Sequence, residues 1–165
     1  PSSAASDVYK RQDNSPIVSA TDRCNMVKLA IKPFDYMSLS TIETDRPGNT
    51  YTADTLAQIY DSYKKIYFII GADSLLYIQD WYHPEYICSH CHLLCANRDN
   101  NSASVLIDQK HFLADKYGAV IDFIDVPKLP YSSTDIRKKV AMGLSVKEDV
   151  GEEVEEYIKS RKLYV

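Results

Sequence analysis

The sequence predicts an α/β fold built on a mainly parallel sheet, and three short apolar runs carry this prediction. Ile66 to Ile70 and His92 to Ala96 are almost continuously apolar, which is typical of strands buried on both faces of a parallel sheet, and Val120 to Val126 is expected to be a further strand. Stretches with helical spacing of apolar residues separate the runs. Strands that alternate with helices along a chain indicate parallel strands with helices packed on the sheet.

Two helices and one further strand are expected before the first run. Thr21 is a candidate cap for a helix that Pro33 closes, since apolar residues recur between them at helical spacing. Tyr36 to Glu43 is expected to be a strand, and the turn signal Arg46-Pro47-Gly48-Asn49 follows it. Thr52 is expected to cap the second helix.

Helices are also expected after each of the three runs. Gly71 to Ser74 ends the first strand and begins a short helix, and Ser104 to Tyr117 is a helix stopped by Gly118. Ser132 to Met142 forms the next helix. The last helix has acidic residues in its first turn and basic residues in its last turn, an order that suits the helix dipole.

Length and composition indicate a soluble globular domain. The 165 residues are 45% apolar and 25% charged, which is ordinary for one folded domain. No apolar run approaches the roughly 20 residues that span a bilayer, and a net charge of -4 gives no electrostatic reason to expect a nucleic acid as partner. The four cysteines are too few for a disulfide scaffold, which favours a reducing, cytoplasmic setting. The sequence leaves the oligomeric state open, a homo-oligomer included.

The first 16 residues are expected to lie outside the fold. They show no apolar periodicity, and we expect a non-native leader or a natural disordered tail, with an α/β domain from Ile17 to Val165. We also expect that a folded N-terminal segment, which would precede this leader, is missing from this sequence.

The segment from Ser132 to Arg137 is the first candidate site. Its hydroxyls and free backbone N–H groups lie at a helix N-terminus, and Ser133 and Arg137 share a face, so that the segment could bind a phosphate. The alternative is purely structural, with Ser132 and Asp135 forming a capping-box variant and Arg137 a solvated charge. Composition alone favours the structural interpretation.

The end of the first apolar run is the second candidate site. Gly71 lets a backbone approach a ligand closely, and Asp73 could bind ribose hydroxyls or act on a metal-bound phosphate. Asp73 could equally be only a helix cap. Trp81 could serve as a flat platform for an aromatic base, although a lone tryptophan more often packs in a core.

A cluster of cysteines and histidines lies between Cys88 and Cys95. Its ligand types invite a zinc interpretation, but Cys95 lies on an expected strand and no second ligand pair follows, so we expect these thiols to pack as small apolar groups. His111 is expected at the surface. No catalytic triad, Walker-type loop or Gly-x-Gly-x-x-Gly segment is present.

Taken in order, several motifs resemble those of bacterial nicotinate-nucleotide adenylyltransferases, from about residue 17 to the C-terminus. The segments that carry the resemblance are Thr21-Asp22-Arg23, Arg46-Pro47-Gly48, Tyr51 to Leu56 (YTADTL), Gly71 to Leu75 (GADSL), Trp81 to Glu85 (WYHPE), Asn97-Arg98-Asp99 and Ser132 to Arg137 (SSTDIR). Each is weak alone, and the ordered set is specific. The resemblance implies a Rossmann-like sheet and transfer of AMP from ATP to nicotinate mononucleotide, with Mg²⁺ carried on the phosphates.

The resemblance also implies roles for individual residues. Tyr51, Thr52, Thr55 and Trp81 match residues that bind the nicotinate nucleotide, with Trp81 stacked on the pyridine ring. Contacts to bound nucleotide match Gly71, Ala72, Asp73 and, more weakly, Arg98. The ATP phosphate site matches Ser132, Ser133, Thr134 and Arg137. Tyr82 stands where many relatives have arginine, which leaves a contact from its side chain open.

The sequence departs from the family pattern at its start. The family begins with a strand, a G-x-F-x-P-x-H-x-G-H segment, a helix and a second strand, and none of these is in the sequence. We therefore assign no catalytic and no metal-binding residue, and we expect the chain alone to show little adenylyl transfer. The alternatives are a related nucleotidyltransferase acting on pantetheine phosphate or nicotinamide mononucleotide, and a catalytically dead nucleotide-binding fragment.

Overall fold

The computed structural model describes residues 18–97, 103–127 and 131–165, which fall into two compact units. The first unit is built from Gly48–Lys128. The second combines the segment that ends at Pro47 with the segment Leu129–Val165. Each unit has its own core and is described by itself.

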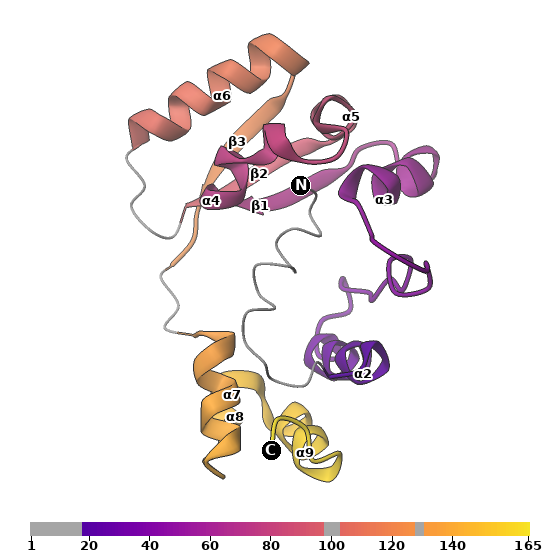
Figure 1. The fold of residues 1–165 in the computed structure, drawn as a ribbon, viewed down its shortest axis with the longest axis vertical. Coiled ribbons are helices and arrows are strands. Elements are labelled where there is room, and N and C mark those ends of the chain that lie inside the picture. Colours follow the sequence, from indigo (N-terminus) through magenta and orange to yellow (C-terminus); the bar gives the residue numbers. More distant parts are fainter. Residues whose placement is uncertain (1–17, 98–102, 128–130) are drawn as a thin grey trace. The chain divides into compact units, whose positions relative to one another are not determined.

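The first unit contains a parallel sheet of three strands. β1 (Tyr67–Gly71), β2 (His92–Asn97) and β3 (Val120–Asp125) follow one another in sequence order across the sheet (Figure 1). Both pairings are parallel, with Ile70 opposite Cys95 and Cys95 opposite Phe123. The predicted α/β class with a parallel sheet is therefore confirmed, and each strand lies within one residue of its expected bounds.

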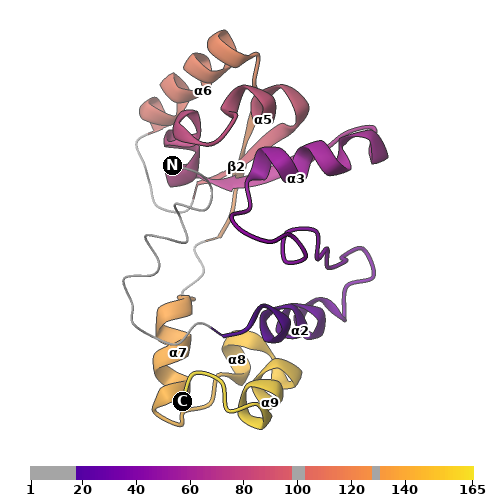
Figure 2. The same cartoon turned by 45° about the vertical axis from the view of Figure 1, so that its right-hand side comes forward.

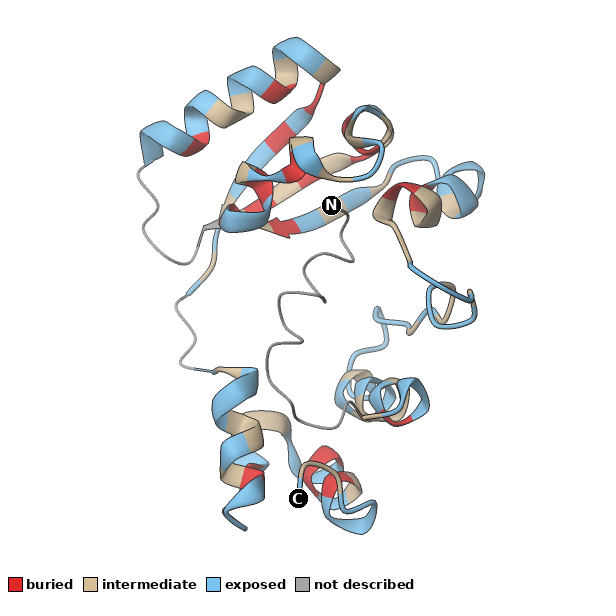
Figure 3. Cartoon of the chain, viewed as in Figure 1, coloured by how far each residue is buried: buried red, intermediate tan, exposed pale blue. Residues whose placement is uncertain are grey.

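Helices pack on one face of this sheet. α4 (Ala72–Leu76), α5 (Pro84–His90) and α6 (Ala103–Tyr117) contact its strands, and α3 (Thr52–Ile59) packs against α5. Two short 3₁₀ turns, η1 (Tyr60–Ser62) and η2 (Ile78–Asp80), complete this unit. The core beneath them contains fully buried aliphatic side chains from sheet and helices, among them Leu75, Ile78, Ile87, Leu93, Leu113 and Ile121 (Figure 3).

In the described part of the chain no element covers the opposite face of the sheet, which corrects the expectation of strands buried on both faces. Ile70 is 4% exposed, whereas its neighbour Ile69 is 67% exposed, and Tyr67 and Val120 are about half exposed. Alternate residues of a strand point to opposite faces. A continuous apolar run therefore does not reveal that only one face of β1 is covered.

The second unit is helical. α2 (Ala20–Ile31), α7 (Ser133–Ala141), α8 (Lys147–Val150) and α9 (Glu152–Ser160) lie side by side in both views (Figures 1 and 2). Its small core contains Val140, Val146, Val154 and Ile158.

Two buried carboxylates tie this helical unit together. Asp22 of α2 accepts hydrogen bonds from Tyr157 Oη (2.8 Å) and Arg161 Nε (3.2 Å), so that it links α2 to the end of α9. Glu155 of α9 accepts from Ser145 Oγ (2.7 Å) and Val146 N (2.8 Å), which fixes the loop before α8. These bonds satisfy groups that burial would otherwise leave without partners.

The expected strand from Tyr36 to Glu43 is wrong. This segment has no strand in the structure, and Tyr36 is 76% exposed. A strand needs a neighbour to satisfy its backbone groups, and the sheet in the described residues consists of β1, β2 and β3 alone.

Helix caps agree with the sequence in part. Ser132 caps α7 as expected, since its hydroxyl accepts from Asp135 N (3.4 Å). The cap of α2 is Ser19 rather than Thr21, and the cap of α3 is Tyr51 rather than Thr52. Gly71 precedes α4, so that Asp73 lies in the first turn rather than at the cap. Within the described residues, no helix is long and apolar enough to cross a membrane.

Candidate functional site

The carboxyl end of β1 places three of the predicted nucleotide-binding residues together. Gly71 ends β1 and caps α4, Ala72 is 6% exposed, and Asp73 presents an exposed side chain in the first turn of α4. The backbone at Gly71 has an ordinary φ, and a Cβ there would meet no atom within 4 Å. The space beside this glycine is therefore open, as a site for a closely approaching ligand requires. Arg98 lies outside the described residues.

The predicted acceptor-binding residues gather at the start of α3 and after η2. Tyr51 caps α3 without a side-chain hydrogen bond to its first turn. Its carbonyl accepts from the backbone N of Thr55 (3.1 Å) and from Thr55 Oγ1 (3.3 Å), and Thr52 is the first residue of the helix. Thr55 Oγ1 is thus turned toward the helix start.

Trp81 follows η2 and packs partly against the core. Its ring meets the Phe68 ring of β1 edge to face, with 6.3 Å between centroids. The side chain remains half-buried, so that core packing and a ring surface for a ligand are both present at this residue. The ring of the next residue, Tyr82, packs against the Tyr51 ring with 4.5 Å between centroids and a tilt of 34° between the ring planes. The structure therefore brings the Trp81 segment against the start of α3.

The predicted phosphate-binding residues lie at the start of α7, in the second unit. Ser132 is half-buried at the cap, and Ser133 and Thr134 are exposed in the first turn. Arg137 Nη2 donates to Thr134 Oγ1 (3.4 Å), so that the guanidinium is drawn toward the helix start. The sequence spacing paired Arg137 with Ser133, whereas the hydrogen bond is to Thr134. The structural capping role and an anion-binding role coexist here, because only one of the first-turn N–H groups is bound by the cap.

The cysteines and histidines do not form a metal centre in the described part of the chain, where no group of three or more potential ligands occurs. Cys88, Cys91 and Cys95 are buried and unpaired. Burial raises the pKa of Cys88 to about 11 and that of Cys91 to about 12. These thiols stay protonated at neutral pH and pack as small apolar groups, as expected. His111 is exposed on α6, which confirms its expected place at the surface.

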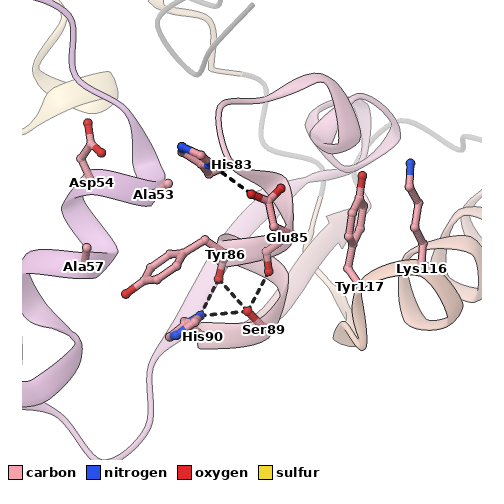
Figure 4. A pocket seen from close by; sticks show the side chains of 10 residues that line it. All are labelled: Ala53, Asp54, Ala57, His83, Glu85, Tyr86, Ser89, His90, Lys116 and Tyr117. Atoms are coloured by element: carbon pink, nitrogen blue, oxygen red, sulfur yellow. Dashed lines mark hydrogen bonds and ion pairs between the residues drawn. The ribbon is translucent and has the colours of Figure 1, made fainter.

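A cavity of about 600 Å³ opens on α3, α5 and the end of α6 (Figure 4). Within the described residues, its lining includes none of the predicted substrate-binding side chains. It does include His83 and Glu85, whose side chains are joined by a 2.8 Å hydrogen bond between His83 Nδ1 and Glu85 Oε1. This bond holds the pKa of Glu85 below its usual value.

The sequence did not predict the contact between the Tyr51 and Tyr82 rings or the backbone conformation of His83. His83 has φ 49° and ψ 58°, in the left-handed region that residues other than glycine seldom adopt. The dipeptide His83-Pro84 was only a partial signal, since a residue before proline is disfavoured in the right-handed helical region but usually adopts an extended backbone instead.

Comparison with known proteins places these features in context. The family model described as cytidylyltransferase-like matches residues 4–139. A probable nicotinate-nucleotide adenylyltransferase of Lachnoclostridium phytofermentans is 34% identical over 153 residues, which cover 92% of this chain and 76% of the relative. One from Moorella thermoacetica is 37% identical, over 90% of this chain and 70% of the relative.

Solved structures agree on the fold. A Plasmodium falciparum nicotinic acid mononucleotide adenylyltransferase complexed with APC matches with a TM-score of 0.68 at 18% identity, over 90% of this chain and 77% of that one. The same enzyme complexed with NaAD matches with the same TM-score and identity, over 92% of this chain.

Proposed function

The chain belongs to the cytidylyltransferase-like family and, within it, to the nicotinate-nucleotide adenylyltransferases, and from this premise we propose that it uses ATP and nicotinate mononucleotide as its substrates. The acceptor's phosphate oxygen forms a bond to the α-phosphorus of ATP, and the bond from that phosphorus to the β-phosphate oxygen breaks. The products are nicotinate adenine dinucleotide and pyrophosphate. The observation that carries the proposal is the identity of 34–37% to relatives of this name over about nine-tenths of the chain.

The acceptor is proposed to bind between the start of α3 and Trp81. The half-buried Trp81 ring offers a flat surface for the pyridine ring, and aromatic rings stack favourably in offset geometry. Tyr51, Thr52 and Thr55 surround the N-terminus of α3, where unpaired N–H groups and the helix dipole favour an anion such as the nicotinate carboxylate. The N-terminus of α3 would therefore favour an acceptor whose pyridine ring carries a negatively charged substituent.

Nucleotide contacts are proposed for two separate groups of residues, one in each unit. Gly71, Ala72 and Asp73 lie at the carboxyl end of a parallel strand, the usual place for ligands in α/β sheets. Arg98 is proposed as a further contact. Ser132, Ser133, Thr134 and Arg137 supply hydroxyls, helix N–H groups and a planar cation suited to the triphosphate.

Mg²⁺ is proposed to accompany ATP rather than to occupy a protein cage. In the described residues no cluster of three ligands exists, and magnesium is commonly held by phosphates with one or two carboxylates. Asp73 is the exposed carboxylate suited to this role. When bound, the ion would neutralise charge on the phosphates.

The proposed reaction requires residues that position the two substrates and neutralise charge on the phosphates, and it requires no nucleophile from the protein. Phosphoryl transfer of this kind rests on alignment and charge stabilisation. The thiols of Cys88 and Cys91 are unsuited to attack, because their raised pKa values keep them protonated. A cytoplasmic location is part of the proposal, and the four unpaired cysteines are consistent with it.

Equilibrium binding tests the acceptor. Trp81 is the single tryptophan of the chain, so that fluorescence excited at the red edge of the tryptophan band reports this site alone. Nicotinate mononucleotide should quench it saturably and more tightly than nicotinamide mononucleotide or phosphopantetheine. Absence of quenching, or preference for phosphopantetheine, would overturn the acceptor assignment.

Calorimetry with Mg²⁺ and ATP tests the donor. Arg137→Ala should weaken ATP binding by about tenfold, the effect of losing one charge-assisted contact. Lys138→Ala, which removes the exposed cation next to it on α7, is the matched control and should change affinity by less than about twofold. Equal effects of the two substitutions would count against a specific role for Arg137. Because we expect little pyrophosphate release from this chain alone, binding of the two substrates, rather than turnover, is the test of the proposal.

A further inference from the structure

Three consecutive residues between η2 and α5 are each held by a different element of the first unit. The Trp81 ring packs edge to face on Phe68 of β1. The Tyr82 ring packs on Tyr51 at the cap of α3. The third residue, His83, is bonded through its side chain to the first turn of α5. The segment is therefore fixed at three points.

The Tyr82 contact is not explained by burial in the core. Tyr82 is 43% exposed, and the aromatic side chain that packs against the core from this segment is Trp81. The Tyr82 ring nevertheless meets rings on two sides, Tyr51 at 4.5 Å and His83 at 4.1 Å with an interplanar angle of 70°. A half-exposed ring held by two others limits the rotamers available to its segment.

The backbone of His83 completes the arrangement. Its left-handed conformation persists only where the surroundings hold it. The surroundings here are the Tyr82 ring on one side and the Glu85 carboxylate on the other, with Pro84 as the first residue of α5. Figure 4 shows the His83 and Glu85 side chains turned toward each other above the start of α5. This turn sets the direction in which the chain leaves Tyr82.

We infer that Tyr82 and His83 are positioning residues that hold the Trp81 ring at a fixed place relative to the start of α3. Such a preformed arrangement would let a planar aromatic acceptor ring stack without first ordering the segment, and ordering costs affinity. The inference rests on the proposed function, because it takes Trp81 as the surface on which the acceptor's ring stacks. It assigns to the Tyr82 side chain a role in acceptor recognition through Trp81, with no contact of its own to the ligand.

Substitutions at Tyr82 test the inference through Trp81 itself. Tyr82→Leu removes the ring that packs on Tyr51 and should lower the steady-state fluorescence anisotropy of Trp81 in the ligand-free chain. It should also raise the dissociation constant of nicotinate mononucleotide by about five- to tenfold. The dissociation constant of ATP should be unchanged. Tyr82→Phe keeps the ring and should therefore show the anisotropy and the nicotinate mononucleotide affinity of the parent chain. A general loss of packing would lower both values in this variant too.

Two further variants complete the experiment. Tyr63→Leu, the same substitution at a tyrosine that is 62% exposed, is the matched control and should leave anisotropy and both affinities as in the parent chain. His83→Val places a β-branched residue where φ is positive and should act like Tyr82→Leu, whereas His83→Asn tolerates this backbone and should remain close to the parent. Circular dichroism melting checks that each variant is folded.

The outcomes separate the inference from the proposed function. If Tyr82→Leu keeps the parent anisotropy and nicotinate mononucleotide affinity, the positioning role is overturned while binding by the parent chain still supports the function. A parallel loss of ATP affinity would also overturn it, since the effect would then be general. If the parent chain fails to bind nicotinate mononucleotide, the function fails, and the anisotropy of the ligand-free variants still decides whether Tyr82 holds Trp81.

Discussion

Glu155 shows how a single buried carboxylate makes the stability of the helical unit depend on pH. Hydrogen bonds from Ser145, Lys159 and the Val146 backbone lower its pKa from 4.5 to about 2. Because the folded pKa is depressed, the ionised form stabilises the fold above the unfolded value of 4.5, and this contribution is lost as pH falls toward 2.

Glu155→Gln is the corresponding prediction. At pH 7 the variant should melt a few degrees below the parent chain, since the amide cannot replace a carboxylate that accepts three hydrogen bonds. The difference should shrink as pH is lowered through the interval from 4.5 to about 2. Melting curves at several pH values measure it. A difference that stays constant with pH would show that the charge of Glu155 is not the cause.

Gly71 gives a second prediction at the scale of one residue. Its φ is ordinary and the place of a Cβ is empty, so that Gly71→Ala should fold normally and melt within a degree or two of the parent. The added methyl group would project into space that the proposed nucleotide site uses, and ATP affinity should fall by about tenfold. Gly118→Ala is not a suitable control, because φ is +68° there. Ser74→Ala, an exposed position in the same short helix, serves instead. Unchanged ATP affinity of Gly71→Ala would show that the nucleotide does not bind at the end of β1.

At the scale of elements, β1 presents two neighbouring isoleucines to very different surroundings. Ile70 is 4% exposed among core side chains, and Ile69 is 67% exposed on the open face. Ile70→Ala should lower the free energy of unfolding by about 3 kcal/mol, because it removes buried methyl groups and leaves a cavity. Ile69→Ala should change it by less than about 1 kcal/mol. Urea unfolding of the two variants makes the comparison, and similar losses would show that the second face of β1 is covered in solution.

Elements were predictable from the sequence where local signals decide them. Apolar runs and helical periodicity located the three strands and most helices, and the capping role of Ser132 followed from its place before a helical stretch. The strand expected from Tyr36 to Glu43 failed because a strand depends on a partner distant in sequence. The exposure of Ile69 could not be predicted either, because the apolar composition of a strand does not indicate which of its faces is covered by another layer.

The candidate site was predictable as a list of residues but not as an arrangement. Motif order singled out Tyr51, Trp81, Asp73 and Arg137, and their roles remain predictions. The ring contact between Tyr82 and Tyr51 joins residues 31 positions apart, and no local sequence pattern predicts such a contact. The left-handed backbone of His83 depends on neighbouring rings and on Pro84, so it too emerges only in three dimensions.

At the scale of the whole molecule, the four cysteines report on the integrity of the fold. Cys88, Cys91 and Cys95 are buried with raised pKa values, whereas Cys24 of α2 is half-buried. The thiolate is the form that alkylating reagents attack. Iodoacetamide at neutral pH should therefore add one group to the native chain, at Cys24, and four to the chain unfolded in guanidinium.

Intact-mass spectrometry counts the adducts, and digestion locates them. Labelling of Cys88 or Cys91 at the rate of the unfolded chain would show that α5 does not stay packed on the sheet, because only exposure to water returns those thiols toward their ordinary pKa. Slow native labelling that follows the unfolding equilibrium would instead measure the stability of the first unit directly. Nicotinate mononucleotide should slow it further if its proposed site at Trp81 and α3 is correct, since a ligand that binds the folded form alone lowers the population of open states.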